Sequence, residues 1–255
     1  MSLTIPNIDH WFSKEVQYTI TTLLLAIDQI TNDVTRDALR AALSSILVRV
    51  SFQDSDTRYA RVDKAVKAAD VYALFQSACK EVARVLLPLG SSRPTAYVVQ
   101  KDIMDAVPGD IPGPVGLVIT SPPYPNAYEY WLYHKYRMWW LGFDPLEVKS
   151  REIGARAHFF KRHHHTDQDF VRQMSHVLTL LKSVLVRSGY ICIVIGRSII
   201  HGQEIDNASI IRNLANDQHL LLVAEIERKI ASSRKSFNLS HARIKTEKLL
   251  VFRKR

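Results

Sequence analysis

The run Val115-Gly116-Leu117-Val118-Ile119-Thr120-Ser121-Pro122-Pro123-Tyr124 decides the fold. Its first half is apolar and has the composition of a strand that is buried on both faces. The second half places a small polar residue, two prolines and an aromatic residue directly after that strand. Each proline fixes its own φ and lacks a backbone N–H, so the turn is stiff. Open α/β sheets bind ligands at the carboxyl ends of such strands, and the sequence therefore predicts an α/β protein with a site here.

The residues after the strand carry the groups that could hold an exocyclic amino group of a nucleobase. The Ser121 side chain and the Pro122 carbonyl are hydrogen-bond acceptors for amino hydrogens. Such a nitrogen is a poor nucleophile, because its lone pair is delocalised into the ring, and fixed acceptors would help it to accept a methyl group. Tyr124 offers a flat face to a base that has left its stack. The alternative interpretation is a tight loop, or a proline-rich ligand for a small recognition domain.

The tetrapeptide Ser121-Pro122-Pro123-Tyr124 resembles the catalytic motif of S-adenosylmethionine-dependent DNA amino-methyltransferases. That motif is Asp, Asn or Ser, followed by Pro-Pro and an aromatic residue. The resemblance implies that all four residues are catalytic, that Ser121 also contacts the cofactor, and that the cofactor is S-adenosyl-L-methionine. The Ser form with a preceding Thr is commoner in enzymes that methylate cytosine N4 than in those that methylate adenine N6. Cytosine is therefore expected first and adenine second.

Upstream of this motif, Thr95–Gln100 is rich in β-forming residues and ends at Lys101-Asp102. The resemblance implies that this is the strand before the catalytic one, and that Asp102 after it binds the adenine of the cofactor. Asp105 is the weaker candidate for that role. From the residues alone, Asp102 can equally cap a short helical turn at 103–107. Both interpretations of Asp102 remain open at this point.

Two segments combine the residue types that contact nucleic acids. Residues 126–141 interleave aromatic rings with Lys and Arg, and residues 228–248 form a basic segment in which Glu247 is the one acid. Aromatic faces stack on bases and cations meet phosphates. The alternatives are core packing for the first segment and a solvated surface for the second. The residues predicted to contact DNA are Asn126, Tyr128, Tyr130, Arg234, Lys235, Arg243 and Lys245.

The last third of the chain predicts the rest of a sheet. A helix begins at Thr166 or Asp167 and is expected to end at Gly189, before an apolar strand over 190–196. After a helix over 206–216, the strands at 220–226 and 247–252 are expected to form an antiparallel pair. Methyltransferase folds end with such a reversed strand, and the Glu-x-Leu-Leu-Val-Phe ending also resembles that of the DNA enzymes. The predicted fold is a partial Rossmann-like methyltransferase sheet with a terminal antiparallel strand pair.

The N-terminal part carries no catalytic pattern but has the periodicity of amphipathic helices. Three helices are expected, at about 13–31, 34–50 and 63–87. The predicted organisation is thus a helical N-terminal region, 1–90, followed by the catalytic, target-base half of a methyltransferase, 91–255. The helices could cover the sheet or recognise a DNA sequence.

Composition agrees with a nucleic-acid partner. The chain has 255 residues, 47% of them hydrophobic, and a formal net charge of +9. Positive charge favours nucleic acid, although it also favours membranes. No run approaches the roughly twenty apolar residues of a membrane-spanning helix, so no membrane association is expected. Cys79 and Cys192 indicate reduced thiols in a cytoplasmic protein, and His163–His165 are expected in an exposed loop with no metal site.

The chain departs from the family at the cofactor. Amino-methyltransferases carry a glycine-rich Phe-x-Gly-x-Gly-type loop after their first strand, and the nine glycines of this sequence do not form it. Three explanations are open: a subunit whose partner supplies the loop, a fragment whose missing half lies upstream, or a noncatalytic nucleic-acid-binding subunit of a modification complex. The intact tetrapeptide favours the first two. The expected function is site-specific DNA methylation, as in restriction-modification.

A missing half-sheet would also leave a bare strand edge, which proteins normally pair or cover. The N-terminal helices or a second copy of the chain, in a homodimer, could cover that edge.

Overall fold

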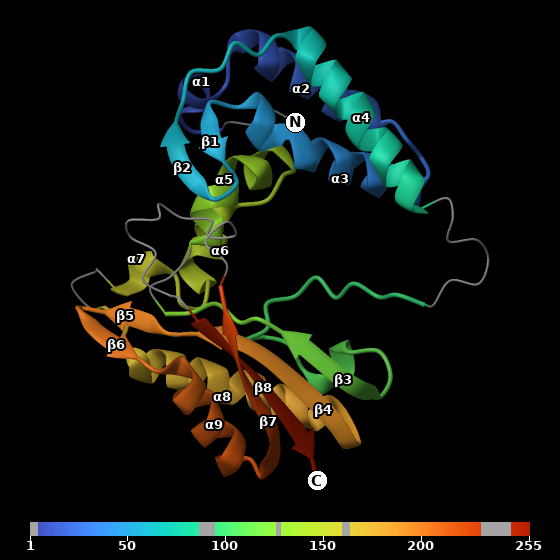
Figure 1. Cartoon of the computed structure of the whole chain (residues 1–255). Coiled ribbons are helices and arrows are strands. Elements are labelled where there is room, and N and C mark those ends of the chain that lie inside the picture. The colour runs from blue at the N-terminus through green and yellow to red at the C-terminus, as the bar shows by residue number, and fades with distance from the viewer. Residues whose placement is uncertain (1–4, 87–94, 126–128, 160–163, 231–245) are drawn as a thin grey trace. The chain divides into compact units, whose positions relative to one another are not determined.

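The computed structural model describes residues 5–86, 95–125, 129–159, 164–230 and 246–255, which fall into two compact units (Figure 1). Unit 1 comprises Met1–Thr95 and Trp131–Ser150, and unit 2 comprises Ala96–Tyr130 and Arg151–Arg255. The sequence predicts a boundary at residue 90, and the units of the structure are divided differently. The aromatic segment after the tetrapeptide groups with the N-terminal helices and not with the sheet.

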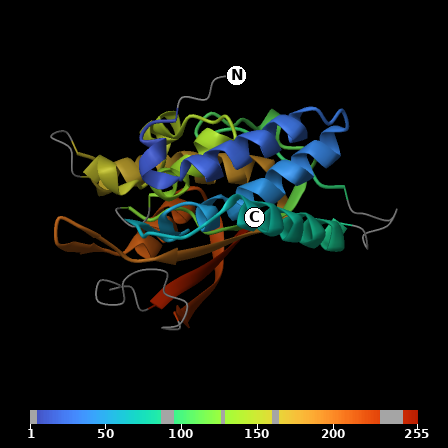
Figure 2. The same cartoon turned by 90° about the horizontal axis from the view of Figure 1, so that it is seen from above.

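Unit 1 is a helical assembly with one small hairpin. Its elements are α1 (Ile8–Trp11), α2 (Lys14–Asp28), α3 (Asp33–Val50), β1 (Gln53–Ser55), β2 (Arg58–Arg61), α4 (Ala68–Leu86), α5 (Tyr130–Trp140) and α6 (Pro145–Arg151). Figures 1 and 2 show α2, α3 and α4 side by side. The three predicted N-terminal helices are confirmed, but α4 begins later than expected. Asp63 pairs with Arg61, and the Asp70 carboxylate accepts the Lys67 N–H at the actual start.

Aromatic side chains from distant segments form the core of unit 1. The ring of Phe12 meets those of Tyr136 and Trp140 edge to face, with centroids 5.8 Å apart in both pairs. Trp11 lies 4.6 Å from Tyr59 and 5.4 Å from Tyr136 between ring centroids. Such pairs add specific ring contacts to the burial of large apolar area. The aromatic helix α5 therefore serves largely as core, as the packing interpretation of this segment expects.

Unit 2 contains the sheet. Its strands are β3 (Val115–Thr120), β4 (Leu185–Gly196), β7 (Leu220–Lys229) and β8 (Thr246–Lys254), in the order β3-β4-β8-β7. β3 and β4 are parallel, and β8 lies antiparallel between β4 and β7. The smaller elements are the 3-10 turn η2 (Pro108–Asp110), α7 (Arg156–Phe159), and the hairpin of β5 (Ser198–Ile200) and β6 (Gln203–Ile205).

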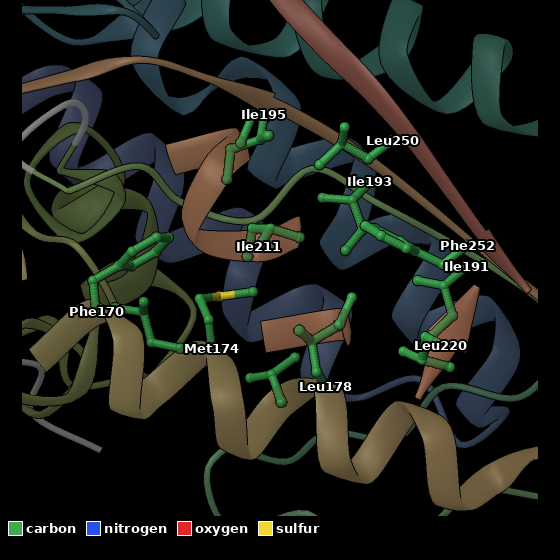
Figure 3. Packing of buried hydrophobic residues seen from close by; sticks show 14 of the residues in the cluster. Phe170, Met174, Leu178, Ile191, Ile193, Ile195, Ile211, Leu220, Leu250 and Phe252 are labelled. Atoms are coloured by element: carbon green, nitrogen blue, oxygen red, sulfur yellow. The ribbon is translucent and has the colours of Figure 1, made fainter. Parts of the chain in front are cut away.

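Helices α8 (Asp167–Val184) and α9 (Asn207–Asp217) pack on this sheet. Residues three and four apart on α8 point to one side, and Figure 3 shows them against the strand residues. The labelled core residues are Phe170, Met174, Leu178, Ile191, Ile193, Ile195, Ile211, Leu220, Leu250 and Phe252. The expected fold class is confirmed: an α/β chain with a helical N-terminal region and an antiparallel strand pair from the end of the chain.

The expectation of a strand before β3 is wrong. Thr95–Gln100 forms no strand, and Val98 is 94% exposed. A strand takes its hydrogen bonds from a neighbour, and among the described residues no strand pairs with this segment.

The expectation that Gly189 ends α8 is also wrong, because α8 ends at Val184 and β4 begins at once at Leu185. Gly189 instead lies inside β4, where the pairing with β3 is irregular. A Cβ on Gly189 would lie 2.8 Å from the Leu185 side chain and 3.1 Å from the Gly116 carbonyl oxygen. The glycine therefore permits a close approach of two strands.

Leu178→Ala tests the packing of α8 on the sheet. Leu178 is fully buried, so its truncation leaves a cavity, and we expect the free energy of unfolding to fall by about 2–5 kcal/mol. Urea unfolding followed by circular dichroism measures the change. Leu222→Ala, at a position of the same unit that is 40% exposed, is the control and should cost clearly less. Equal losses for the two variants would contradict this assignment of the core.

Candidate active site

The tetrapeptide Ser121–Tyr124 directly follows β3 and forms a lip at the carboxyl end of that strand. Ser121 is exposed, Pro122 is buried, and Pro123 and Tyr124 are half-buried. Tyr124 packs against the core of unit 2. The lip is thus anchored by Pro122 and Tyr124, while the polar side chain of Ser121 is exposed. This is the position at which an α/β sheet binds ligands.

The Tyr124 hydroxyl is the centre of a polar cluster. It donates a hydrogen bond of 2.9 Å to Oε1 of Glu247, on β8. Burial raises the pKa of Tyr124 well above its ordinary value, and the negative charge of Glu247 raises it further. The Ser121 side chain and the Gly196 backbone lower the pKa of this hydroxyl, but by less than the opposing effects raise it. Tyr124 is therefore a neutral hydroxyl at physiological pH.

Glu247 is fixed on the sheet by its backbone and by a cation. It lies opposite Gly196 of β4 on one side and Arg228 of β7 on the other. The Arg228 guanidinium forms an ion pair with Oε2, and the Glu247 side chain is only 15% exposed. The carboxylate raises the pKa of Arg228, so the guanidinium stays charged. Sequence reasoning did not select Glu247 or Arg228 as site residues. The one sequence feature that could have pointed to Glu247 is that it is the only acid in the basic segment 228–248.

Gly154 backs the lip on its main-chain side. Its φ is 74°, and a Cβ there would lie 2.7 Å from the Tyr124 carbonyl oxygen. Beside it, Glu152 accepts the backbone N–H of Tyr130 at 2.8 Å. The segment 152–154 therefore holds both the lip and the chain that leaves it. Sequence reasoning missed this contact, because a single glycine between other residues gives no sign of a neighbour thirty residues away.

Asp102 lies in the turn expected from its residues. Its Oδ1 accepts the Met104 N–H at 2.8 Å, and its Oδ2 pairs with Nε of Arg151 at 2.6 Å. The same guanidinium also pairs with Asp105. Asp102 thus caps a turn and neutralises a cation, and its cofactor role stays a prediction.

Of the residues predicted to contact DNA, one lies in the described part of the chain. Tyr130 is half exposed at the start of α5, and burial together with the nearby Glu152 raises the pKa of its hydroxyl. The other six lie outside the described residues: Asn126, Tyr128, Arg234, Lys235, Arg243 and Lys245.

Histidines gather near α8, but the described residues include no group of three or more side chains suited to a metal ion. The ring centroids of His164 and His201 are 4.6 Å apart, and those of His165 and His158 are 4.8 Å apart. No helix in the described part of the chain is long and apolar enough to cross a bilayer.

Comparisons with known proteins find similarity in solved structures alone. No family model and no curated protein matches the sequence. Crystal structures of a Thermus thermophilus protein, provisionally described as a DNA modification methylase, align over 60% of this chain. One has 18% identity and a TM-score of 0.37 with 52% of its own length covered. Another, in complex with S-adenosyl-L-methionine, has 19% identity and a TM-score of 0.36 with 53% covered. The chain spans about half the length of these structures.

Gly154→Ala tests the support of the lip. The substitution adds a Cβ against the Tyr124 carbonyl and strains a left-handed backbone, so we expect a loss of about 1–3 kcal/mol in stability. Thermal unfolding measures the loss. Gly109→Ala is the matched control, because a Cβ there meets nothing within 4 Å. A Gly154 variant as stable as this control would show that the close approach is absent.

The protonation of Tyr124 gives a pH prediction. An unfolded tyrosine ionises near pH 10, about its ordinary pKa, whereas folded Tyr124 keeps its proton to higher pH. Its contribution to stability is therefore complete below about pH 10 and is lost as pH rises through the folded pKa. The tyrosinate absorbance of the wild type, after subtraction of the absorbance of the Tyr124→Phe variant, should titrate with a midpoint clearly above pH 10. A difference curve centred near 10 would contradict the buried contact.

Proposed function

We propose that the chain takes part in DNA methylation, with transfer of a methyl group from S-adenosyl-L-methionine to an exocyclic amino group, of cytosine first and of adenine second. One observation carries the proposal: the lip Ser121–Tyr124 stands at the carboxyl end of a parallel strand, with Ser121 exposed and Tyr124 anchored. Glu247, whose side chain is only 15% exposed, holds the tyrosine of this loop in place.

In this function the lip holds the amino group for attack. Ser121 Oγ and the Pro122 carbonyl accept the two amino hydrogens, which frees the nitrogen lone pair from the ring. Tyr124 lies beside the base, and its contact with Glu247 keeps its ring in one orientation. Fixed acceptors of this kind need no reorganisation during the reaction. When bound, the cofactor would supply an electrophilic methyl group: its methyl–sulfur bond would break as the new N–C bond forms, S-adenosyl-L-homocysteine would leave, and the proton lost by the nitrogen would pass to water.

The described residues fit part of the cofactor. Asp102 uses one acceptor position of each carboxylate oxygen, and a carboxylate has about four. It can therefore still accept a hydrogen bond from the amino group of the cofactor's adenine. Ser121, the other residue predicted to contact the cofactor, directly follows β3. The glycine-rich loop for the methionine part is lacking in the sequence.

We propose that a second subunit or an upstream segment completes the cofactor pocket. Among the described strands β3 pairs with β4 alone, and Leu117 and Ile119 of β3 are 53% and 74% exposed. Parallel strands are normally buried on both faces, so the exposed apolar face of β3 can accept a covering layer, and its unpaired edge can accept a further strand. The same edge would carry the missing strands and their loop. A second copy of the chain, in a homodimer, is the other candidate for covering it.

The competing function is a noncatalytic nucleic-acid-binding subunit of a modification complex. The lack of the glycine-rich loop and the engagement of Asp102 by Arg151 favour it. Calorimetric titration with S-adenosylmethionine separates the two functions, first with the chain alone and then with DNA and a co-encoded partner. Binding in any of these mixtures supports the methyltransferase, whereas DNA binding with no cofactor binding in all of them supports the noncatalytic subunit.

Ser121→Ala combined with Tyr124→Ala tests the lip directly. The double variant loses an acceptor and the flat face, so we expect methyl transfer to DNA to fall at least about a hundredfold. Transfer of a radiolabelled methyl group measures the rate, with the partner present where cofactor binding requires it. Thr21→Ala with Tyr18→Ala, at exposed positions of α2, is the control and should keep full activity. Full activity of the lip variant would refute the assigned roles.

A further inference from the structure

We propose that Lys135, on α5, belongs to an anion site of unit 1 that holds a backbone phosphate of a nucleic acid, whatever the base sequence. The inference goes beyond the proposed function, because it concerns unit 1 and assigns no role to the lip. Contacts to the phosphate backbone position a nucleic acid and carry no sequence information. The site therefore supplies affinity and not recognition of a base.

The Lys135 ammonium is surrounded by aromatic rings. Its Nζ lies 4.5 Å from the centroid of the Tyr59 ring. The ring centroids of Tyr136 and Trp139 are 5.2 Å and 5.8 Å from the same atom. An aromatic ring attracts a cation through its quadrupole but carries no net charge. These rings therefore hold the ammonium in place without neutralising it.

The rings are themselves fixed by packing. Tyr136 is buried, and its ring centroid lies 5.2 Å from that of Trp139. Tyr59 packs on Trp11, with 4.6 Å between the ring centroids. A lysine held against fixed rings has already lost part of its side-chain freedom. An anion that binds it has less to order, which favours binding.

Among the described residues no carboxylate forms an ion pair with Lys135. The acids of the hairpin that carries Tyr59 are engaged by other cations: Asp54 pairs with Arg58, and Asp56 pairs with Arg137. Lys135 is half-buried, and a charge that is partly removed from water is costly to leave without an opposite charge. The site therefore favours an anion from outside the chain.

A second lysine lies on the same face of α5. Trp131 and Lys135 are four residues apart on this helix, so their side chains are neighbours. The Lys149 ammonium, from α6, lies 4.5 Å from the centroid of the Trp131 ring. Two ammonium groups on one face repel each other, and a phosphate between them would relieve the repulsion. The pKa of Lys135 agrees, because burial lowers it and the charge of Lys149 lowers it further.

A nucleic acid fits this site better than an acidic protein does. Lysine binds a phosphate as a compact point charge, and it needs no fixed orientation of the oxygen atoms. Phosphates recur along a strand at a regular spacing, so a pair of held ammonium groups can engage any position of it. The formal net charge of +9 attracts such a strand from a distance.

Lys135→Met tests the site, because methionine keeps an apolar side chain against the rings and removes the charge. Fluorescence anisotropy over a series of salt concentrations measures the affinity of the full chain for two single-stranded oligomers, of thymidine and of deoxyadenosine. We expect the slope of log affinity against log salt to become shallower by about 0.7 for both oligomers, the value of one phosphate contact. Lys149→Met is the second variant and should also give a shallower slope. A thermal melt confirms that each variant is folded.

Lys14→Met is the matched control, because Lys14 is a lysine of the same unit whose charge is paired with Asp9. Its slope should equal that of the wild type. An unchanged slope in Lys135→Met, an equal change in Lys14→Met, or an effect on one oligomer alone overturns the inference. Displacement of the oligomers by poly-glutamate, with the same dependence on Lys135, would assign the site to an acidic protein and would overturn it too.

Failure of the proposed function is a separate outcome of this experiment. A slope that depends on Lys135, without methyl transfer in any mixture, would remove the reaction and leave the phosphate site in place. Methyl transfer with an unchanged slope would do the reverse.

Discussion

The parallel pairing of β3 with β4 is the interaction on which the candidate site depends. It sets Thr120 opposite Ile193, so the residues that follow β3 run toward the end of β4. There Gly196 lies opposite Glu247 of β8, and Tyr124 reaches that carboxylate. A shift of one residue would turn the inward side chains of a strand to the opposite face. The register of three strands therefore fixes a contact that no short segment could form.

Sequence reasoning succeeded where the signal was local. The apolar run 115–119, the three- and four-residue spacing in α8, and each of the last two strands have a signal that lies within a single element. It did not find the support of the lip, because that support is long-range. Glu247 stands 123 positions from Tyr124, and Gly154 is identified only by the carbonyl that faces it. The predicted end of α8 was wrong, because Gly189 allows β3 and β4 to approach closely and does not terminate the helix.

The other departures concern the segment before β3 and the exposed side chains of β3. Thr95–Gln100 has the residues of a strand and lies outside the described sheet, while β3 exposes Leu117 and Ile119. β-propensity describes how a side chain fits a half-buried pleated surface, so it takes effect only where a neighbouring strand provides that surface. The glycine-rich loop that the resembled family carries after its first strand is also lacking from the sequence. In the proposed function, completion of the sheet beyond β3 by another segment or subunit would explain all three observations.

Charge is distributed unevenly between the lip and the chain as a whole. The net charge is +9, yet Arg228 pairs with Glu247, which holds the lip, and Arg151 pairs with both Asp102 and Asp105. Phosphate contacts supply most of the affinity for DNA and need unpaired cations, which these pairs do not offer. In the proposed function, affinity must then come from basic residues elsewhere, and the lip contributes acceptors that discriminate between bases. This separation is physically favourable, because a cation at Ser121 would repel the amino hydrogens that the lip has to hold.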